Sequence, residues 1–130
     1  MQIKNLITLP GLLGISSAAL VQIGFDASLN YDFVSANPTT QAQIFQLLPQ
    51  GVAFALGIAA DAVPVQSLQP LDTSADLGYI TTLAVFDLDD ALVDQLRLDI
   101  VSPTSPLYNN PDAAVHELVS HINPNIPLLA

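Results

Sequence analysis

The sequence has no cysteine and almost no basic residues, and these two absences exclude several classes of function. Without cysteine there are no disulfides, no thiolate zinc sites and no cysteine nucleophiles. The chain has twelve Asp and Glu residues, and its only lysine and arginine are Lys4 and Arg97, which gives a net charge of -10. A surface of this sign repels phosphate backbones and anionic lipids. The sequence therefore predicts no binding to nucleic acid and no electrostatic attachment to a membrane.

Charge of either sign is scarce. Charged residues make up 11% of the chain, against about 25% in an average soluble protein. Solvated lysines, which usually protect an exposed sheet edge from association, are missing. The low charge favours an extracellular or self-associating surface over a typical cytosolic one. With 130 residues, about half of them apolar, the chain is long enough for one domain with its own core.

Motifs that carry chemistry are also missing. There is no G-x-S-x-G turn, no Gly-rich phosphate loop after a strand, and no N-glycosylation site, because "NPT" at Asn37 is blocked by its proline. His116 and His121 are five residues apart, so on a helix their rings point about 140° apart. A helical zinc site needs an i, i+4 pair. We interpret both histidines and Glu117 as parts of an amphipathic helix rather than as metal ligands.

The acidic residues have a similar structural interpretation. Asp26, Asn30 and Asp32 share a loop and carry oxygens of the kind that calcium binds. The loop lacks the alternating acidic ladder, central glycine and closing glutamate of a calcium site, so we interpret these residues as turn formers. The other acidic groups considered are explained as a helix cap, first-turn charges or turn residues: Asp87, Asp89, Asp90, Asp72 and Asp76. The sequence predicts a protein that is not an enzyme, with no catalytic, cofactor-binding or metal-binding residues.

Residues 1–19 form an apolar leader or linker before a single domain at 20–130. The stretch "MQIKNLITLPGLLGISSAAL" has a basic start, an apolar middle and small residues at its end. Three interpretations stay open: a leader that packs on the domain, a secretory signal peptide, and a membrane anchor. Pro10, Gly11 and Gly14 interrupt the apolar run and disfavour the anchor.

Hydrophobic periodicity predicts the order of the elements in residues 20–130. Strands are expected at 20–25, 62–71 and 79–88, helices at 37–57, 87–98 and 111–122, an extended piece at 98–103, and a last short strand at 125–129. Pro49 and Gly51 are expected to kink or divide the first helix. The order predicts an α+β fold of the ferredoxin-like type, β-α-β-β-α-β, with an antiparallel sheet and helices on one face. The helix at 111–122 would be an additional C-terminal helix.

Four stretches resemble one family: "LVQIGFDASLNYDFV", "AQIFQLLPQGVAFALGI", "VQSLQPLDTSADLGYITTLAV" and "SPLYNNPDAAVHEL". From Leu20 to Leu129 the chain resembles the membrane-proximal ectodomain of fungal signalling mucins. These are single-pass cell-surface proteins that sense osmotic or surface cues upstream of a MAP-kinase cascade.

This resemblance implies a SEA-like domain that passes through the secretory pathway to the cell surface. The implied partners are other cell-surface or cell-wall proteins or a second copy of the chain, as a homo-oligomer. Membrane contact is implied only through a tether. Self-cleaving SEA domains carry a Gly-Ser step between their second and third strands, and "PLDTSADLGYI" has none, so no autoproteolysis is implied.

Two alternatives remain open. One is a secreted structural protein that forms oligomers or filaments through its sheet edges or its apolar leader. The other is an enzyme or small-ligand binder that uses the sheet face opposite the helices, an idea that rests on fold analogy alone.

Overall fold

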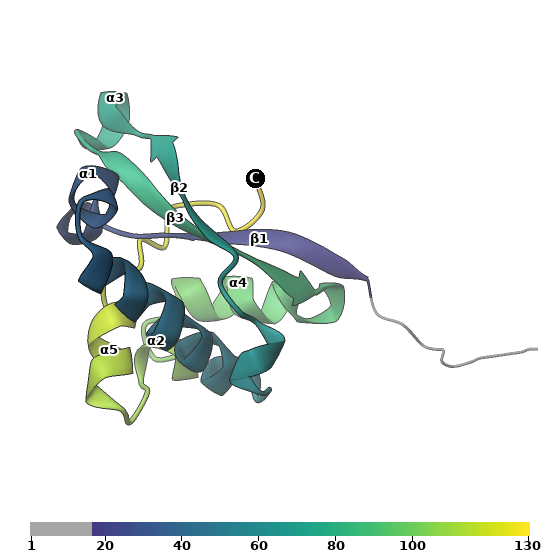
Figure 1. Cartoon of the computed structure of the whole chain (residues 1–130). Helices are drawn as coiled ribbons and strands as arrows, with labels where there is room; N and C mark the ends of the chain where they lie inside the picture. The colour runs from purple at the N-terminus through teal and green to yellow at the C-terminus, as the bar shows by residue number, and fades with distance from the viewer. Residues whose placement is uncertain (1–16) are drawn as a thin grey trace, which may run out of the picture.

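The computed structural model describes residues 17–130, so the predictions made for the leader before Ser17 lie outside the described residues. The described chain is an α+β domain built on a three-stranded antiparallel sheet with the strand order β1-β3-β2. The strands are β1 (Ala18–Gly24), β2 (Ser67–Asp72) and β3 (Ile80–Asp89). The helices α2 (Pro38–Leu56), α4 (Val93–Val101) and α5 (Ala113–Val119) lie on one side of this sheet (Figure 1).

Short elements fill the connections between the larger ones. The helices α1 (Tyr31–Ser35) and α3 (Ser74–Leu77) lie toward one end of the sheet (Figure 1). The 3-10 turns are η1 (Ala27–Leu29), η2 (Ala60–Ala62), η3 (Asp90–Leu92) and η4 (Pro106–Tyr108).

The core lies between the sheet and the three larger helices. The predicted alternation in the first strand is confirmed, because Val21, Ile23 and Phe25 are all buried. On β3, Phe86 and Leu88 belong to the same core cluster. Burying one such side chain fully contributes about 1.5–3 kcal/mol, so this apolar face stabilises the packing of the sheet against the helices.

The longest helix begins and ends as predicted but is not divided. Pro38 occupies the first turn of α2, and Gly57 closes the helix in the left-handed conformation at φ 69°. The helix runs unbroken through Pro49, so of the two expected outcomes, a kink or a division, the division is wrong. Gly51 has a packing role, because a Cβ atom there would come within 2.9 Å of the Val119 side chain on α5. The glycine lets the two helices approach closely.

The boundary between the third strand and the next helix lies later than predicted. Leu88 is shared by the strand expected at 79–88 and the helix expected at 87–98, and in the structure it belongs to β3 and pairs with Ala19. Asp89 then caps η3 by accepting a hydrogen bond from the Ala91 amide at 2.9 Å. Helix α4 continues to Val101, where an extended piece was expected. A single apolar residue at this junction fits the period of a strand and that of a helix equally well.

The last helix keeps its predicted buried face with a different cap. The helix expected at 111–122 would have Asn110 as its cap, but Asp112 caps α5, since its Oδ1 accepts hydrogen bonds from the Ala114 and Val115 amides at 2.9 and 3.1 Å. The predicted core side of this helix is buried: Val115, Leu118, Val119 and Ile122. The apolar period therefore located the packing face even though the cap lies two residues later.

The C-terminal segment, residues 123–130, follows the edge of β1 without forming the predicted fourth strand. The Asn123 amide donates to the Gly24 carbonyl at 2.8 Å, and the Gln22 amide donates to the Leu128 carbonyl at 2.9 Å. Pro124 and Pro127 carry no N–H group and cannot complete a ladder. The fourth strand of a β-α-β-β-α-β order is thus absent from residues 17–130.

Proline also marks the opposite edge of the sheet. β2 pairs with β3 on one side only and contains Pro70, as expected for an edge strand that tolerates proline. A proline on the open side offers no donor to another chain, which protects this edge in the absence of lysine.

Candidate functional site

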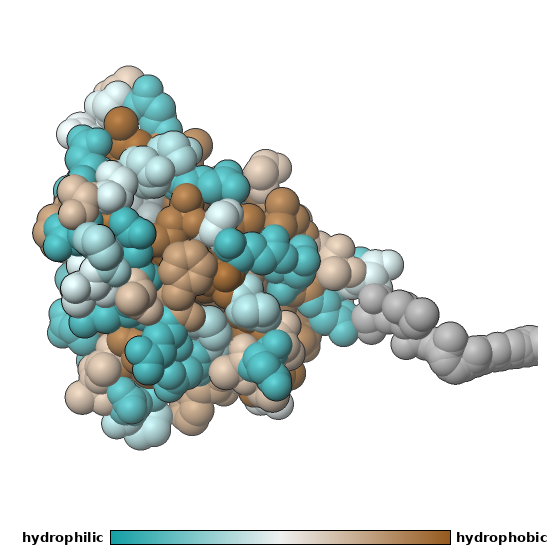
Figure 2. All heavy atoms as spheres, viewed as in Figure 1, coloured by the Kyte–Doolittle hydropathy of each residue, from teal (hydrophilic) through white to brown (hydrophobic). Residues whose placement is uncertain are grey.

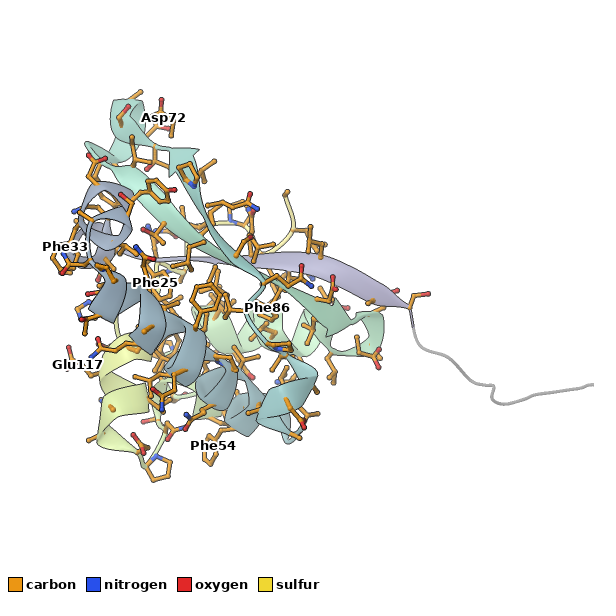
Figure 3. All side chains as sticks on the ribbon, viewed as in Figure 1. Phe25, Phe33, Phe54, Asp72, Phe86 and Glu117 are labelled. Carbon is orange, nitrogen blue, oxygen red and sulfur yellow. The ribbon has the colours of Figure 1, made fainter. Side chains whose placement is uncertain are left out.

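His121 is the centre of a charged cluster that joins three parts of the chain. Its side chain is 27% exposed and lies just after α5. Its Nδ1 atom is 3.1 Å from Oδ2 of Asp26, which follows β1. Its Nε2 atom is 3.0 Å from Oε2 of Glu117, one helical turn earlier and at the margin of the molecule (Figure 3). The imidazole therefore bridges two carboxylates.

The two carboxylates favour the protonated form of the imidazole. Partial burial by itself lowers the pKa of His121, but the hydrogen bonds to Asp26 and Glu117 and their negative charges more than offset it. The net result is a His121 pKa raised from its ordinary 6.5. Only the imidazolium has an N–H on both nitrogens, so only this form donates to both carboxylates. A neutral ring presents one lone pair to a carboxylate oxygen, and that contact is repulsive.

A shallow hollow lies beside this cluster. It has a volume of about 250 Å³, and Glu117 and His121 contribute to a lining that is otherwise apolar apart from Gln43. The apolar part of the lining consists of Leu29, Leu47, Ala114 and Leu118. Sites for small organic ligands usually enclose about 300–1,000 Å³. The hollow is smaller than such a site, and its two ionisable side chains are already bonded to each other.

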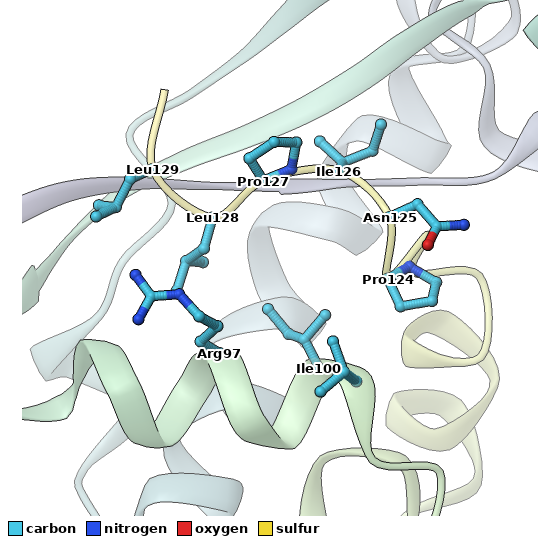
Figure 4. A pocket seen from close by; sticks show the side chains of 9 residues that line it. Arg97, Ile100, Pro124, Asn125, Ile126, Pro127, Leu128 and Leu129 are labelled. Carbon is cyan, nitrogen blue, oxygen red and sulfur yellow. The ribbon is translucent and has the colours of Figure 1, made fainter. Parts of the chain in front are cut away.

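A second hollow separates α4 from the C-terminal segment (Figure 4). Its volume is about 210 Å³, and Arg97 and Ile100 face the segment from the helix. Arg97 is the only lysine or arginine in residues 17–130. Its guanidinium pairs with Asp94 on the same helix, so its charge already has a partner.

Tyr108 in η4 lies near the end of α4. Burial raises the pKa of Tyr108 to about 12, and its hydroxyl donates to the Ile100 carbonyl. Tyr108 therefore holds a loop in place and does not exchange protons near neutral pH.

A third hollow, of about 300 Å³, lies where α1 and α2 approach β2. Phe45 and Leu68 line it together with Tyr31. Phe45 is 41% exposed. Hydrophobic side chains gather in the middle of the face that Figure 2 shows. Each of the three hollows described above is lined in part by residues of at least one helix.

The residues considered as ligands of calcium serve the backbone instead. Asp26 caps η1 by accepting from the Ser28 amide at 3.0 Å, and Asn30 caps α1 by accepting from the Phe33 amide at 2.9 Å. These contacts confirm the turn interpretation of both residues. His116 is exposed and does not join the His121 cluster. Within the part of the chain that the structure describes, no group of three metal-ligating side chains is arranged to hold an ion.

Two other acidic residues have separate structural roles. Asp72 accepts hydrogen bonds from the hydroxyl and the amide of Ser74, and these bonds lower the pKa of Asp72. Asp87, Asp89 and Asp90 were expected to supply one cap and two first-turn charges of a helix, which is wrong for Asp87. It lies in β3 and accepts a hydrogen bond from Gln66 Nε2 at 2.6 Å.

Sequence reasoning missed the contact between His121 and Asp26. The two residues are 95 positions apart, and no local pattern connects them. The i, i+4 spacing of Glu117 and His121 was visible in the sequence and predicts a contact on one helix face. A helical zinc site needs two histidines at this spacing, so the pair of Glu117 and His121 did not meet that criterion.

The model of the MSB2 C-terminal domain family matches residues 8–122 of the chain. The chain belongs to this family. Two curated relatives have names that support the resemblance to fungal signalling mucins. The chain is 35% identical over 115 residues to the cell surface sensor MSB2 of Pyricularia oryzae. It is 28% identical over 109 residues to the signaling mucin MSB2 of Saccharomyces cerevisiae.

These matches cover most of this chain and a small part of each MSB2 relative. In both comparisons 84% of this chain is covered, against 14% of the Pyricularia protein and 8% of the Saccharomyces protein. No solved structure matches the domain. Within residues 17–130, no helix combines the length and the apolar character needed to cross a membrane.

Proposed function

We propose that this domain is a non-catalytic extracellular module of a fungal cell-surface mucin, standing close to the membrane and acting upstream of a MAP-kinase cascade. The observation that carries the proposal is the match to the MSB2 C-terminal domain family over residues 8–122. The names of the two relatives, a cell surface sensor and a signaling mucin, support the same role.

The chemistry of the site favours a structural and recognition role over catalysis. His121, Asp26 and Glu117 bond to one another, and Arg97 bonds to Asp94. Side chains that are already paired within the fold hold segments together. They are poorly placed to bind a substrate in a hollow of about 250 Å³.

We also propose that the fold is a variant of the ferredoxin-like, SEA-like arrangement. In that arrangement the fourth strand lies beside the first. Here the C-terminal segment lies at the same edge of β1, bonded to it through Gln22 and Gly24. The order β1-β3-β2 of the other strands agrees with this arrangement.

A domain exchange tests the functional proposal. The matching domain of the Pyricularia sensor would be replaced by residues 17–130 of this chain in a strain that lacks the native sensor. We expect the exchange to restore phosphorylation of the MAP kinase when the cells meet a surface or osmotic cue. Surface labelling of the exchanged protein would verify that it reaches the plasma membrane.

A core variant provides the control for this exchange. Leu96 is fully buried on α4, and Leu96→Asp should unfold the domain by placing a charge in the core. The exchanged protein with Leu96→Asp should give no response. A native exchange that reaches the surface and leaves the kinase unphosphorylated would contradict the proposal.

A further inference from the structure

The junction at His121 joins the end of β1, the end of α5 and the start of the C-terminal segment. Besides its two side-chain contacts, His121 accepts a hydrogen bond at its backbone carbonyl from the Asp26 amide at 2.8 Å. Phe25 and Ile122 form an isolated antiparallel bridge next to it. The Asn123 amide continues the contact by donating to the Gly24 carbonyl. A change in the charge of the His121 imidazole therefore affects the point at which backbone hydrogen bonds connect β1 with the C-terminal segment.

We propose that His121 is a proton-operated clamp, which holds the end of α5 and the C-terminal segment against β1 at acidic pH and loosens them as the pH rises. The geometry carries this inference, since both ring nitrogens face carboxylate oxygens at about 3 Å. The clamp does not rest on the proposed function.

Within residues 17–130 the only lysine or arginine is Arg97, which pairs with Asp94, so no described basic side chain takes the place of the imidazolium. Asp26 faces the ring from the start of η1, and Glu117 faces it from α5. α2 lines the same hollow with Gln43 and Leu47 and has no titratable side chain. In the rest of α5, His116 is exposed, and Asp112 caps the opposite end of the helix. In α1, Asp32 is exposed in the first turn.

The direction of the pH dependence follows from the raised pKa of His121 in the folded protein. A group whose pKa is higher in the folded state than in the unfolded state binds its proton more tightly when folded. Its contribution is fully present below the unfolded value of about 6.5 and is lost as the pH rises through the folded value. The clamp is therefore closed in acid and opens toward neutral and alkaline pH.

Amide hydrogen exchange measured by NMR on the intact 130-residue protein tests the clamp. Samples between pH 5 and pH 9 would contain EDTA, so that no metal ion replaces the proton. Protection factors, which correct for the intrinsic effect of pH on exchange, would be compared for the amides of Asp26, Asn123 and Gln22. The amide of Phe25, which donates to Thr82 within the sheet, serves as the internal control.

In the native protein we expect the three junction amides to lose protection by roughly two- to fivefold as the pH rises, as for partly exposed charge pairs. The Phe25 amide should show no such step. His121→Gln should give low protection at every pH. Asp26→Asn and Glu117→Gln should each reduce the step, and Asn retains the cap of η1 because it caps as well as Asp.

The variant His116→Gln provides the matched control, because it removes the other histidine from the same helix. It should behave as the native protein does. The clamp is refuted if His121→Gln keeps the native pH step, or if the native protein shows none. Either result would leave the domain exchange unaffected, since that experiment is done at a single pH.

Discussion

At the scale of the single residue, Asp99 is the least favourable polar group of the described domain. It is 4% exposed on α4. Its Oδ1 accepts a hydrogen bond from Gln95 Nε2 at 3.0 Å, while Oδ2 has no partner. A buried oxygen that accepts no hydrogen bond has lost its contact with water without a compensating interaction, which destabilises the folded state. The carboxylate also lies two residues before the end of α4, where the helix dipole disfavours negative charge.

We predict that Asp99→Asn raises the free energy of unfolding by about 1 kcal/mol, because a neutral amide costs less to bury than a carboxylate. Urea unfolding followed by circular dichroism would measure it. The matched control is Asp94→Asn, the same change in the first turn of the same helix. That change should lower stability slightly, since it removes the pairing with Arg97. Equal effects from the two variants would show that loss of net charge, and not burial, is responsible.

At the scale of the element, the C-terminal segment depends on the absence of a side chain at one position of β1. A Cβ atom at Gly24 would lie 2.6 Å from Ile126 Cγ1. The segment also contributes Leu128 to the core. The contact between Gly24 and Ile126 therefore fixes how closely the segment approaches the strand, and with it the position of Leu128.

We predict that Gly24→Ala destabilises the domain by about 1–3 kcal/mol, as overpacking of a close contact does. The Cβ atom of Ile126 would itself lie 2.8 Å from the new methyl group, so the whole side chain must be removed to relieve the contact. Gly24→Ala with Ile126→Gly should therefore be more stable than the sum of the two single changes implies. Thermal unfolding of the four proteins of this cycle measures the coupling. Strict additivity would mean that the segment moves aside without cost.

The sequence predicted the elements whose periodicity is strong and local. The first strand and the helix after Asn37 were located correctly because their apolar residues recur at the period of each element. The junction after β3 was misplaced, since Leu88 fits either type of element and only its pairing with Ala19 decides. The fourth strand was also predicted wrongly because its absence depends on tertiary structure. Pro124 and Pro127 prevent a ladder of hydrogen bonds with β1, and this is evident only when the segment is seen beside that strand. The contact of His121 with Asp26 also depends on tertiary structure, so no local pattern predicts it.

At the scale of the whole molecule, negative charge has little internal compensation. The net charge is -10, and Arg97 is the only lysine or arginine in residues 17–130. Self-repulsion of this kind destabilises a compact state and keeps copies of the molecule apart. Any proton that binds the protein reduces this repulsion, so acid can stabilise the domain without the clamp. A comparison with His121→Gln separates the clamp from this reduction in net charge.

We predict that salt stabilises the domain. Raising the ionic strength from about 0.01 M to 0.15 M shortens the Debye length from about 30 Å to about 8 Å, which screens repulsion between exposed carboxylates. The Tm measured by calorimetry should rise over this range with either sodium or lithium chloride. A Tm that stays constant or falls would show that the carboxylates lie too far apart for their repulsion to matter.

The scarcity of lysine and arginine also affects how this domain is observed. Trypsin cuts after these two residue types, and between Lys4 and Arg97 the sequence offers it no position. Arg97 itself lies within α4, where the folded backbone does not fit a protease cleft. Tryptic digests will contain this domain mainly as peptides too long for routine mass spectrometry. A protease that cleaves at acidic residues, of which the chain has twelve, is the appropriate reagent for its detection.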